Sequence, residues 1–229
     1  MSAPRRLLLY TKPAVPGRVK TRLTTVLTAE QAADVHRAFV GDVVERLGRG
    51  EFDLRIAWAL RADEEIPGAD LLPRPVPGFR QEGRDLGERL FRGLRTAARL
   101  DGGARAVAAF GSDHPMVRLE TLHEAFGRVE AGADAVLGPS LDGGYHLIVL
   151  AAGAVRPELF EGIDWSTGRV LAQTRERIGT AGLRLETVAE ALDVDTPEDL
   201  DRLAEELAAA EPGFCPRTRR VLDALGRWH

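Results

Sequence analysis

Residues 105–115 read RAVAAFGSDHP, a short apolar run that ends in a glycine, an aspartate and a proline. A buried run of this length between breakers is typical of a strand in a parallel sheet, although periodicity alone does not exclude a helical segment. Pro115 lacks an N–H and pushes His114 into an extended or turn conformation, so the strand is expected to end near Asp113. Open α/β sheets bind ligands at the carboxyl ends of their strands, which makes Asp113 a candidate site residue. The alternative is that Asp113 only turns or caps the chain.

Apolar runs and amphipathic segments alternate along the rest of the chain, without an internal repeat. Residues 61–80 are rich in proline, glycine and acidic residues and are expected to form a loop with little regular structure. The alternation predicts one α/β domain over residues 1–229, with a mostly parallel sheet covered by helices on both faces. Further strands are predicted at 6–11, 52–60, 135–139, 145–150 and 183–188, and helices at 29–47, 85–100, 119–129, 165–178 and after Pro197.

The composition of the chain narrows the class of protein. Hydrophobic residues make up 44% of the 229 residues and charged residues 29%, as in an ordinary globular protein. A net charge of -4 argues against a nucleic-acid partner, whose binding surface is usually basic. A single cysteine, Cys215, excludes an internal disulfide, and no apolar run approaches the roughly 20 residues that span a bilayer. We therefore expect a soluble, cytoplasmic protein without a membrane partner, and the sequence leaves its oligomeric state open.

A cationic loop is predicted directly after the first strand. Residues 12–23 read KPAVPGRVKTRL, and two prolines and a glycine favour a loop that holds Lys12, Arg18, Lys20 and Arg22. In an acidic protein this local positive charge favours an anionic ligand, most plausibly a nucleotide phosphate held by the loop and the helix start that follows. The alternative is a solvated charged loop. The spacing of a Walker loop is absent.

Three acidic groups are candidates for a metal site: Asp113, Asp142 and the segment 193–199, which reads DVDTPED. Mg²⁺ is typically held by one or two carboxylates, and substrate phosphates and waters complete its coordination. Asp113 at a strand end and Asp195 before a helix could converge on one ion. The 193–199 segment is equally well explained as a helix start, with Asp195 or Thr196 as N-cap and Pro197 at the first helical position.

Six stretches carry a resemblance to a known family. They are TKP at 11–13 with PGRVKTRL at 16–23, DLGER at 85–89, GSDHP at 111–115, LGP at 137–139 with DGGY at 142–145, WST at 165–167 and DVDTP at 193–197. With these stretches the chain resembles, along nearly its whole length, small bacterial proteins with the Rossmann-like GT-A fold of nucleotide-diphospho-sugar transferases, often described as arsenosugar-associated glycosyltransferases. It also resembles a related branch, the nucleotidyltransferases that build cofactor precursors such as molybdopterin dinucleotide.

The resemblance implies a nucleotide bound over the loop after the first strand, with Mg²⁺ or Mn²⁺ at Asp113. GT-A enzymes usually bridge metal and diphosphate with a D-x-D motif, and Gly111-Ser112-Asp113 keeps only the second acid, so Asp195 or Asp142 is expected to supply the second ligand. On the matching stretches, the expected nucleotide contacts are Lys12, Gly17, Lys20, Arg22, Gly87 and Ser112, and the expected sugar or acceptor contacts are Gly143, Gly144, Tyr145 and Trp165.

The leading hypothesis is glycosyl transfer from a nucleotide diphosphate sugar to an unknown small acceptor. The metal, Lys20 and Arg22 would stabilise the negative charge that develops on the leaving group. Asp142 would contact sugar hydroxyls or serve as general base, and His146 is a second candidate base because its ordinary pKa is near neutral. Since Tyr145 and His146 are neighbours in a strand, they should point to opposite faces and only one can face the site.

Two other functions stay open. In nucleotidyl transfer, a phosphorylated acceptor attacks the α-phosphate of a nucleoside triphosphate and releases pyrophosphate, while Lys20 and the metal neutralise the phosphates and no sugar-activating base is required. In the third reading, the protein is a nucleotide-binding regulator that keeps the fold and the Asp113 site without catalysis.

Overall fold

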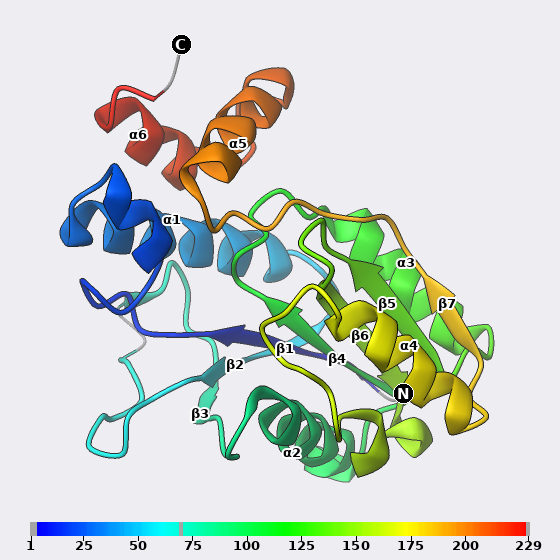
Figure 1. Cartoon of the computed structure of the whole chain (residues 1–229). Helices are drawn as coiled ribbons and strands as arrows, with labels where there is room; N and C mark the ends of the chain where they lie inside the picture. Colours follow the sequence, from blue (N-terminus) through cyan, green and yellow to red (C-terminus); the bar gives the residue numbers. More distant parts are fainter. Residues whose placement is uncertain (1–3, 69–70, 228–229) are drawn as a thin grey trace.

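The computed structural model describes residues 4–68 and 71–227, and within these ranges one seven-stranded sheet forms the centre of the protein (Figure 1). The strand order is β3-β2-β1-β4-β6-β5-β7. β6 runs antiparallel to β4 and β5, and the other neighbouring strands are parallel, which confirms the predicted mostly parallel sheet. The strands are β1 (Arg5–Thr11), β2 (Asp53–Trp58), β3 (Gly78–Arg80), β4 (Ala106–Gly111), β5 (Ala135–Pro139), β6 (Tyr145–Ala151) and β7 (Leu185–Thr187).

Helices cover both faces of the sheet, also as predicted. Successive residues of a strand point to opposite faces, so a strand buried on both sides needs an uninterrupted apolar run such as Leu7, Leu8 and Leu9. Leu7 and Leu9 pack against α1 (Ala29–Leu47) and α3 (Leu119–Glu130), whereas Leu8 packs towards α2 (Leu86–Arg99) and α4 (Val170–Thr180). A third apolar cluster joins α1 to α5 (Pro197–Ala209) and α6 (Pro216–Ala224). Short 3₁₀ helices are η1 (Thr21–Thr25), η3 (Leu100–Gly102), η4 (Ala152–Ala154) and η5 (Pro157–Leu159).

Side-chain caps fix where several helices begin. Thr28 and Gln31 form a capping box at α1, and the Asp85 carboxylate accepts a hydrogen bond from the Glu88 N–H at the start of α2. At α5 the N-cap is Thr196, whose side chain accepts from Asp199 N–H, and Pro197 follows it. Asp195 therefore does not serve as the N-cap, and its carboxylate is available for other contacts.

Two predicted element boundaries were wrong. Helix α4 begins at Val170 and not at Trp165, because Ser166 has φ 64° and the Thr167 hydroxyl donates to Asp164 O, which builds a turn in place of a first helical turn. The predicted loop 61–80 ends in the short strand β3, which pairs with the C-terminal part of β2. Its three residues are too few to show a periodic pattern in the sequence.

The fold gathers distant segments at one edge of the sheet. β1, β2 and β4 are parallel, so their carboxyl ends point the same way (Figure 1). The segment after β7 returns across this edge: Ala191 bridges to Ser140, and the Val194 N–H donates to Asp113 O at 3.1 Å. This hydrogen bond holds the acidic 193–199 segment at the end of β4. Among the helices described here, none is long and apolar enough to cross a membrane.

Candidate functional site

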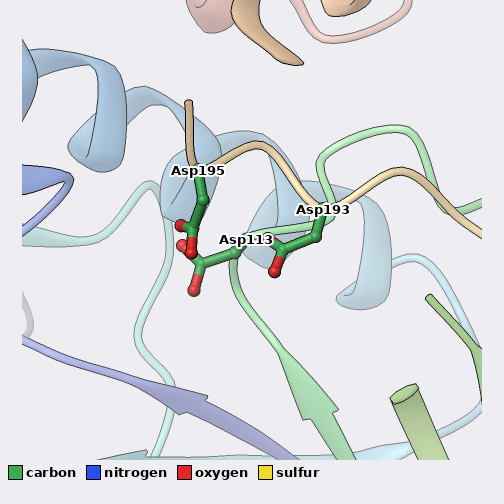
Figure 2. Close-up of side chains that lie close together, drawn as sticks. All are labelled: Asp113, Asp193 and Asp195. Atoms are coloured by element: carbon green, nitrogen blue, oxygen red, sulfur yellow. The ribbon is translucent and has the colours of Figure 1, made fainter. Parts of the chain in front are cut away.

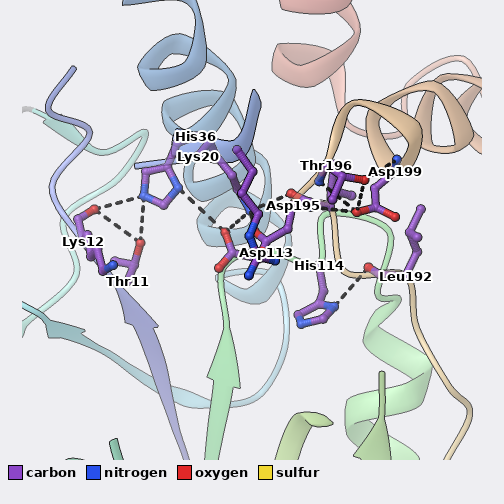
Figure 3. A network of polar contacts seen from close by, with 12 residues as sticks. Thr11, Lys12, Lys20, His36, Asp113, His114, Leu192, Asp195, Thr196 and Asp199 are labelled. Atoms are coloured by element: carbon purple, nitrogen blue, oxygen red, sulfur yellow. Dashed lines mark hydrogen bonds and ion pairs between the residues drawn. The ribbon is translucent and has the colours of Figure 1, made fainter. Parts of the chain in front are cut away.

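Lys20 lies at the centre of the site and joins the loop after β1 to the acidic residues (Figure 3). Its backbone is left-handed at φ 47°, directly before η1, and its side chain is only 2% exposed. The ammonium group forms an ion pair with Asp113, another with Asp195 Oδ1 at 3.0 Å, and donates to Val194 O at 2.7 Å. Because an ammonium group has three protons, these three acceptors satisfy it completely.

Three carboxylates converge beside Lys20. One oxygen each of Asp113, Asp193 and Asp195 lies within 4.8 Å of the others (Figure 2). Asp113 and Asp195 therefore do approach one another as the sequence suggested, whereas Asp193 was missing from the predicted metal ligands. A pattern in the sequence could have found it, because residues two apart in an extended segment point to the same side. We call Asp113, Asp193 and Asp195 the acidic cluster.

The charges within the acidic cluster perturb one another strongly. Burial would raise the pKa of Asp113, but the positive charge and hydrogen bond of Lys20 outweigh it and lower that pKa to about 2. Burial lowers the pKa of Lys20, but the negative charges of Asp113 and Asp195 together have a larger effect in the opposite direction. The pKa of Lys20 is therefore raised. Burial and the neighbouring charges of Asp195 and Asp113 raise the pKa of Asp193 to about 8. Lys20 thus contacts two carboxylates with a single positive charge, and Asp193 forms no ion pair among the described residues.

The acidic cluster has the chemistry of a site for a hard divalent cation. Carboxylate oxygens are the ligands that Mg²⁺ and Mn²⁺ prefer. Asp193 Oδ1 is buried and has no hydrogen-bond partner, which is costly unless a cation or proton compensates it. Asp142 is not part of this cluster. Its Oδ1 accepts hydrogen bonds from the Ser140 hydroxyl at 2.6 Å and the Gly144 N–H at 2.9 Å, so it stabilises the turn between β5 and β6.

Of the other residues predicted to bind the nucleotide in this region, Arg22 contacts the acidic cluster. Arg22 is exposed and its guanidinium lies 3.7 Å from Asp195 Oδ2. Arg18 is engaged elsewhere, in a two-point contact with Glu64. Lys12 and Gly17 are exposed, with Gly17 in a turn at φ 74°. Ser112 is buried, and its N–H donates to Tyr10 O at 3.2 Å. Phosphate binding by these residues stays a prediction.

The glycines predicted to admit a ligand are packed against the protein itself. Gly143 has φ 85°, and a Cβ there would overlap the carbonyl oxygen of Gly168. A Cβ on Gly87 would lie 2.6 Å from Nε1 of Trp165. Gly144 faces Asp142, its neighbour in the turn. The close approaches that require these glycines are therefore intramolecular, and contact of Gly87, Gly143 and Gly144 with a ligand stays a prediction.

Tyr145 and His146 lie on opposite faces of the sheet, as the strand pattern predicted. Tyr145 packs on the α2 side, with Tyr10 and Trp165. His146 lies on the other side, is 2% exposed, and contacts His114 with ring centroids 5.3 Å apart. Burial, with a smaller contribution from His114, lowers the pKa of His146 to about 4. Its Nε2 is enclosed by protein, so His146 is a weak and inaccessible base, contrary to the expectation from its ordinary pKa.

His36, which the sequence did not single out, also belongs to the site. It is 4% exposed, and its Nδ1 lies 3.9 Å from Asp113 Oδ1 (Figure 3). The signal that could have found it is its place in the apolar face of α1, where Val35 and Phe39 are also buried. A histidine on the buried face of a helix that follows the cationic loop is a candidate for a polar contact inside the protein.

Residues 42–167 match a family described as uncharacterized proteins conserved in bacteria (DUF2064), and the chain belongs to this family. Together with the relatives below, the fold and the site define it as an enzyme of the nucleotidyltransferase or nucleotide-sugar-transferase type.

Two relatives are similar over almost the whole chain. A phosphoenolpyruvate guanylyltransferase of Conexibacter woesei is 32% identical over 91% of both chains. A protein from Desulfovibrio desulfuricans G20, provisionally described as a nucleotide-diphospho-sugar transferase, has a solved structure with 33% identity and a TM-score of 0.89, covering 99% of this chain and 98% of that one.

A more distant structure shares the fold alone. CMP-2-keto-3-deoxy-manno-octonic acid synthetase in complex with CTP has a TM-score of 0.56 and 12% identity, covering 90% of this chain and 99% of that one.

Proposed function

We propose that this protein is a metal-dependent nucleotidyltransferase that couples a nucleoside triphosphate to a phosphorylated small molecule and releases pyrophosphate. The observation on which this depends is the contact of Lys20 with Asp113 and Asp195 beside a third carboxylate, Asp193. Such a site handles phosphate charge, and nucleotidyl transfer requires no sugar-activating base. Of the two residues considered as a base for glycosyl transfer, His146 is enclosed, and Asp142 Oδ1 accepts the hydrogen bonds of a turn.

The reaction forms one bond and breaks one. An oxygen of the acceptor phosphate attacks the α-phosphorus of the triphosphate, the bond between the α-phosphorus and its bridging oxygen breaks, and pyrophosphate leaves with both electrons of that bond. Asp113, Asp193 and Asp195 would hold Mg²⁺ or Mn²⁺, which when bound neutralises charge on the triphosphate. Lys20 adds a fixed positive charge that needs no reorganisation during the reaction.

The first substrate pair to test comes from the Conexibacter relative. Its name specifies guanylyl transfer to phosphoenolpyruvate, and 32% identity over 91% of the chain makes a triphosphate and a phosphorylated carboxylic acid the natural starting class. Both substrates are polyanions. Arg22 is exposed beside Asp195, Lys12 is exposed in the same loop, and both would supply positive charge that these anions require.

Glycosyl transfer from a nucleotide diphosphate sugar to a small acceptor is the second candidate. It is supported by the 33% identity to the Desulfovibrio desulfuricans protein described as a nucleotide-diphospho-sugar transferase. In this reaction Asp142, which is exposed at the turn between β5 and β6, would contact the sugar.

One assay separates the two reactions. Purified protein with Mg²⁺ is incubated with each nucleoside triphosphate plus phosphoenolpyruvate, and separately with nucleotide diphosphate sugars plus acceptor mixtures. Release of pyrophosphate that depends on the acceptor supports nucleotidyl transfer. Release of a nucleoside diphosphate from a nucleotide sugar, without pyrophosphate from any triphosphate, would reverse the order of the two candidates.

A further inference from the structure

His36 presents an unused nitrogen to the acidic cluster. Its Nε2 lies 3.1 Å from Lys12 O and 3.3 Å from the Thr11 hydroxyl. The other nitrogen, Nδ1, is buried, has no hydrogen-bond partner, and faces Asp113 Oδ1 at 3.9 Å (Figure 3). A buried polar atom without a partner is rare in folded proteins, and this one is directed at a candidate metal site.

The backbone decides which nitrogen carries the proton. A carbonyl oxygen only accepts hydrogen bonds, so the contact with Lys12 O requires a proton on Nε2. In a neutral imidazole one nitrogen donates and the other accepts, and the contact with Lys12 O makes Nε2 the donor. In a neutral ring protonated on Nε2, Nδ1 holds a lone pair and acts as an acceptor.

Two acceptors therefore face one another across 3.9 Å, and neither can donate to the other. This arrangement is unfavourable unless a proton donor lies between or beside them. Mg²⁺ keeps several of its waters when it binds to proteins, and metal-bound waters are strong donors. We propose that Nδ1 of His36 accepts a hydrogen bond from a water molecule of a divalent cation held at Asp113, so that His36 is a positioning residue for the hydrated metal.

The proposal rests on the metal of the proposed function and extends it to the cationic loop. Through Nε2, the same ring holds Lys12 O and the Thr11 hydroxyl, at the point where β1 enters that loop. Metal binding at the acidic cluster and the position of the cationic loop would be linked through one side chain. Partners of this kind, one step removed from a metal, typically contribute about 10- to 100-fold to its affinity.

The two nitrogens can be tested separately with two amide variants. In H36N the short amide lies near the position of Nδ1 and can still accept from a water, but it no longer reaches Lys12 O. In H36Q the longer amide can still donate to Lys12 O but places no acceptor towards Asp113. H123Q is the matched control, because His123 lies on α3 and contacts Arg5 and Phe52.

Mn²⁺ binding, measured without nucleotide by the electron paramagnetic resonance of free Mn²⁺, gives a readout that does not depend on activity. We expect H36Q to bind Mn²⁺ at least about 10-fold more weakly than the wild type, H36N to stay within about 3-fold, and H123Q to be unchanged. Wild-type affinity in H36Q, or equal losses in H36N and H36Q, would overturn the proposal, since equal losses indicate a purely structural role.

A separate variant, D113N, tests metal binding itself, independently of the role of His36. If D113N abolishes Mn²⁺ binding while H36Q leaves it intact, only the role of His36 is wrong. If the wild type binds no Mn²⁺, both the metal and the role of His36 are wrong.

Nuclear magnetic resonance of wild-type protein labelled with ¹⁵N-histidine covers the case in which H36Q does not fold. Addition of Mg²⁺ should shift the Nδ1 resonance of His36 in the direction of hydrogen-bond acceptance and leave that of His123 in place. An unmoved His36 resonance at saturating Mg²⁺ contradicts the proposal.

Discussion

The ammonium group of Lys20 lies 3.0 Å from Asp195 Oδ1, although 175 positions separate the two residues in the chain. Lys20 directly precedes η1, and Asp195 directly precedes Thr196, the N-cap of α5. The contact therefore joins the loop after the first strand to the last third of the chain, and it brings the cationic loop and the acidic cluster into one site. Lys12 and Lys20 are the two lysines in a sequence whose other basic side chains are arginines and histidines.

Replacing Lys20 with methionine should destabilise the protein without metal and weaken nucleotide binding. Three carboxylates would then lie together without their counter-charge, and we expect a loss of about 2 kcal/mol in the free energy of unfolding, less than for a fully buried pair because Asp113 and Asp195 are about 40% exposed. Mg²⁺ should restore part of this loss by replacing the missing charge. Urea unfolding with and without Mg²⁺ measures both effects. K12M removes an exposed lysine from the same loop and should leave stability unchanged; an equal loss in both variants would contradict the role of Lys20.

Replacing Lys20 with arginine should also weaken nucleotide binding. Its three protons meet three acceptors, namely Asp113, Asp195 and Val194 O, in a side chain that is 2% exposed. A planar guanidinium is larger and has a fixed fork geometry, so K20R keeps the charge and loses the fit. We expect K20R to retain less than about a tenth of wild-type nucleotide affinity, measured by calorimetry, as one lost charge-assisted contact implies. Wild-type affinity in K20R would mean that only the charge matters.

Asp113→Asn should abolish turnover and leave the fold intact. Asp113 is the acidic residue that contacts both Lys20 and, at longer range, His36, and it belongs to the acidic cluster. Loss of a residue that holds the metal typically costs several kcal/mol of transition-state stabilisation, or at least about 100-fold in kcat. The rate of pyrophosphate release measures this, and circular dichroism checks the fold. D201N, which alters an exposed carboxylate on α5, is the control and should retain the wild-type rate.

His146 should make the protein sensitive to acid. Because burial lowers the pKa of His146 from 6.5 to about 4, the unfolded state binds a proton between these pH values that the native state does not bind. The contribution of this residue to stability is therefore complete above pH 6.5 and is lost as the pH falls towards 4, by up to roughly 3 kcal/mol. Urea unfolding at several pH values should show a smaller acid loss in H146N than in the wild type. Parallel pH profiles for the two proteins would show that the pKa of His146 is the same in the native and the unfolded state.

The sequence predicts most of the fold because its signals are local. The apolar runs of β1 and β4 and the caps at Thr28, Asp85 and Thr196 act over a few residues, so they place strands and helices without knowledge of the tertiary structure. Helix α4 is the exception. The left-handed backbone of Ser166 delays the start of this helix, and a serine in the sequence does not predict a left-handed conformation.

The site was only partly predictable, because its contacts are long-range. Charge and position indicated Lys20, Asp113 and Asp195 separately, yet nothing in the sequence states that one ammonium group contacts both carboxylates. His36 shows the opposite case. Its helix was predicted correctly, but the direction of Nδ1 towards Asp113 depends on how α1 packs against the end of β4. The packing of Gly143 in the β5–β6 turn could not be predicted either, since its close neighbour Gly168 comes from another loop.

The turn between β5 and β6 should depend on Gly143 for two reasons that can be separated. Gly143 has φ 85°, which costs about 1–2 kcal/mol for any residue with a Cβ, and that Cβ would also overlap the carbonyl oxygen of Gly168. Gly182 has φ 68° and open space around it, so G182A isolates the backbone cost alone. We expect G143A to lose at least about 1 kcal/mol more in the free energy of unfolding than G182A, because overpacking adds to the backbone cost. If the second candidate, glycosyl transfer, is the reaction, G143A should also lower its rate, since Asp142 lies in the displaced turn. Equal losses in the two variants would show that the loop carrying Gly168 moves aside freely, and that contact with it does not hold Asp142 in place.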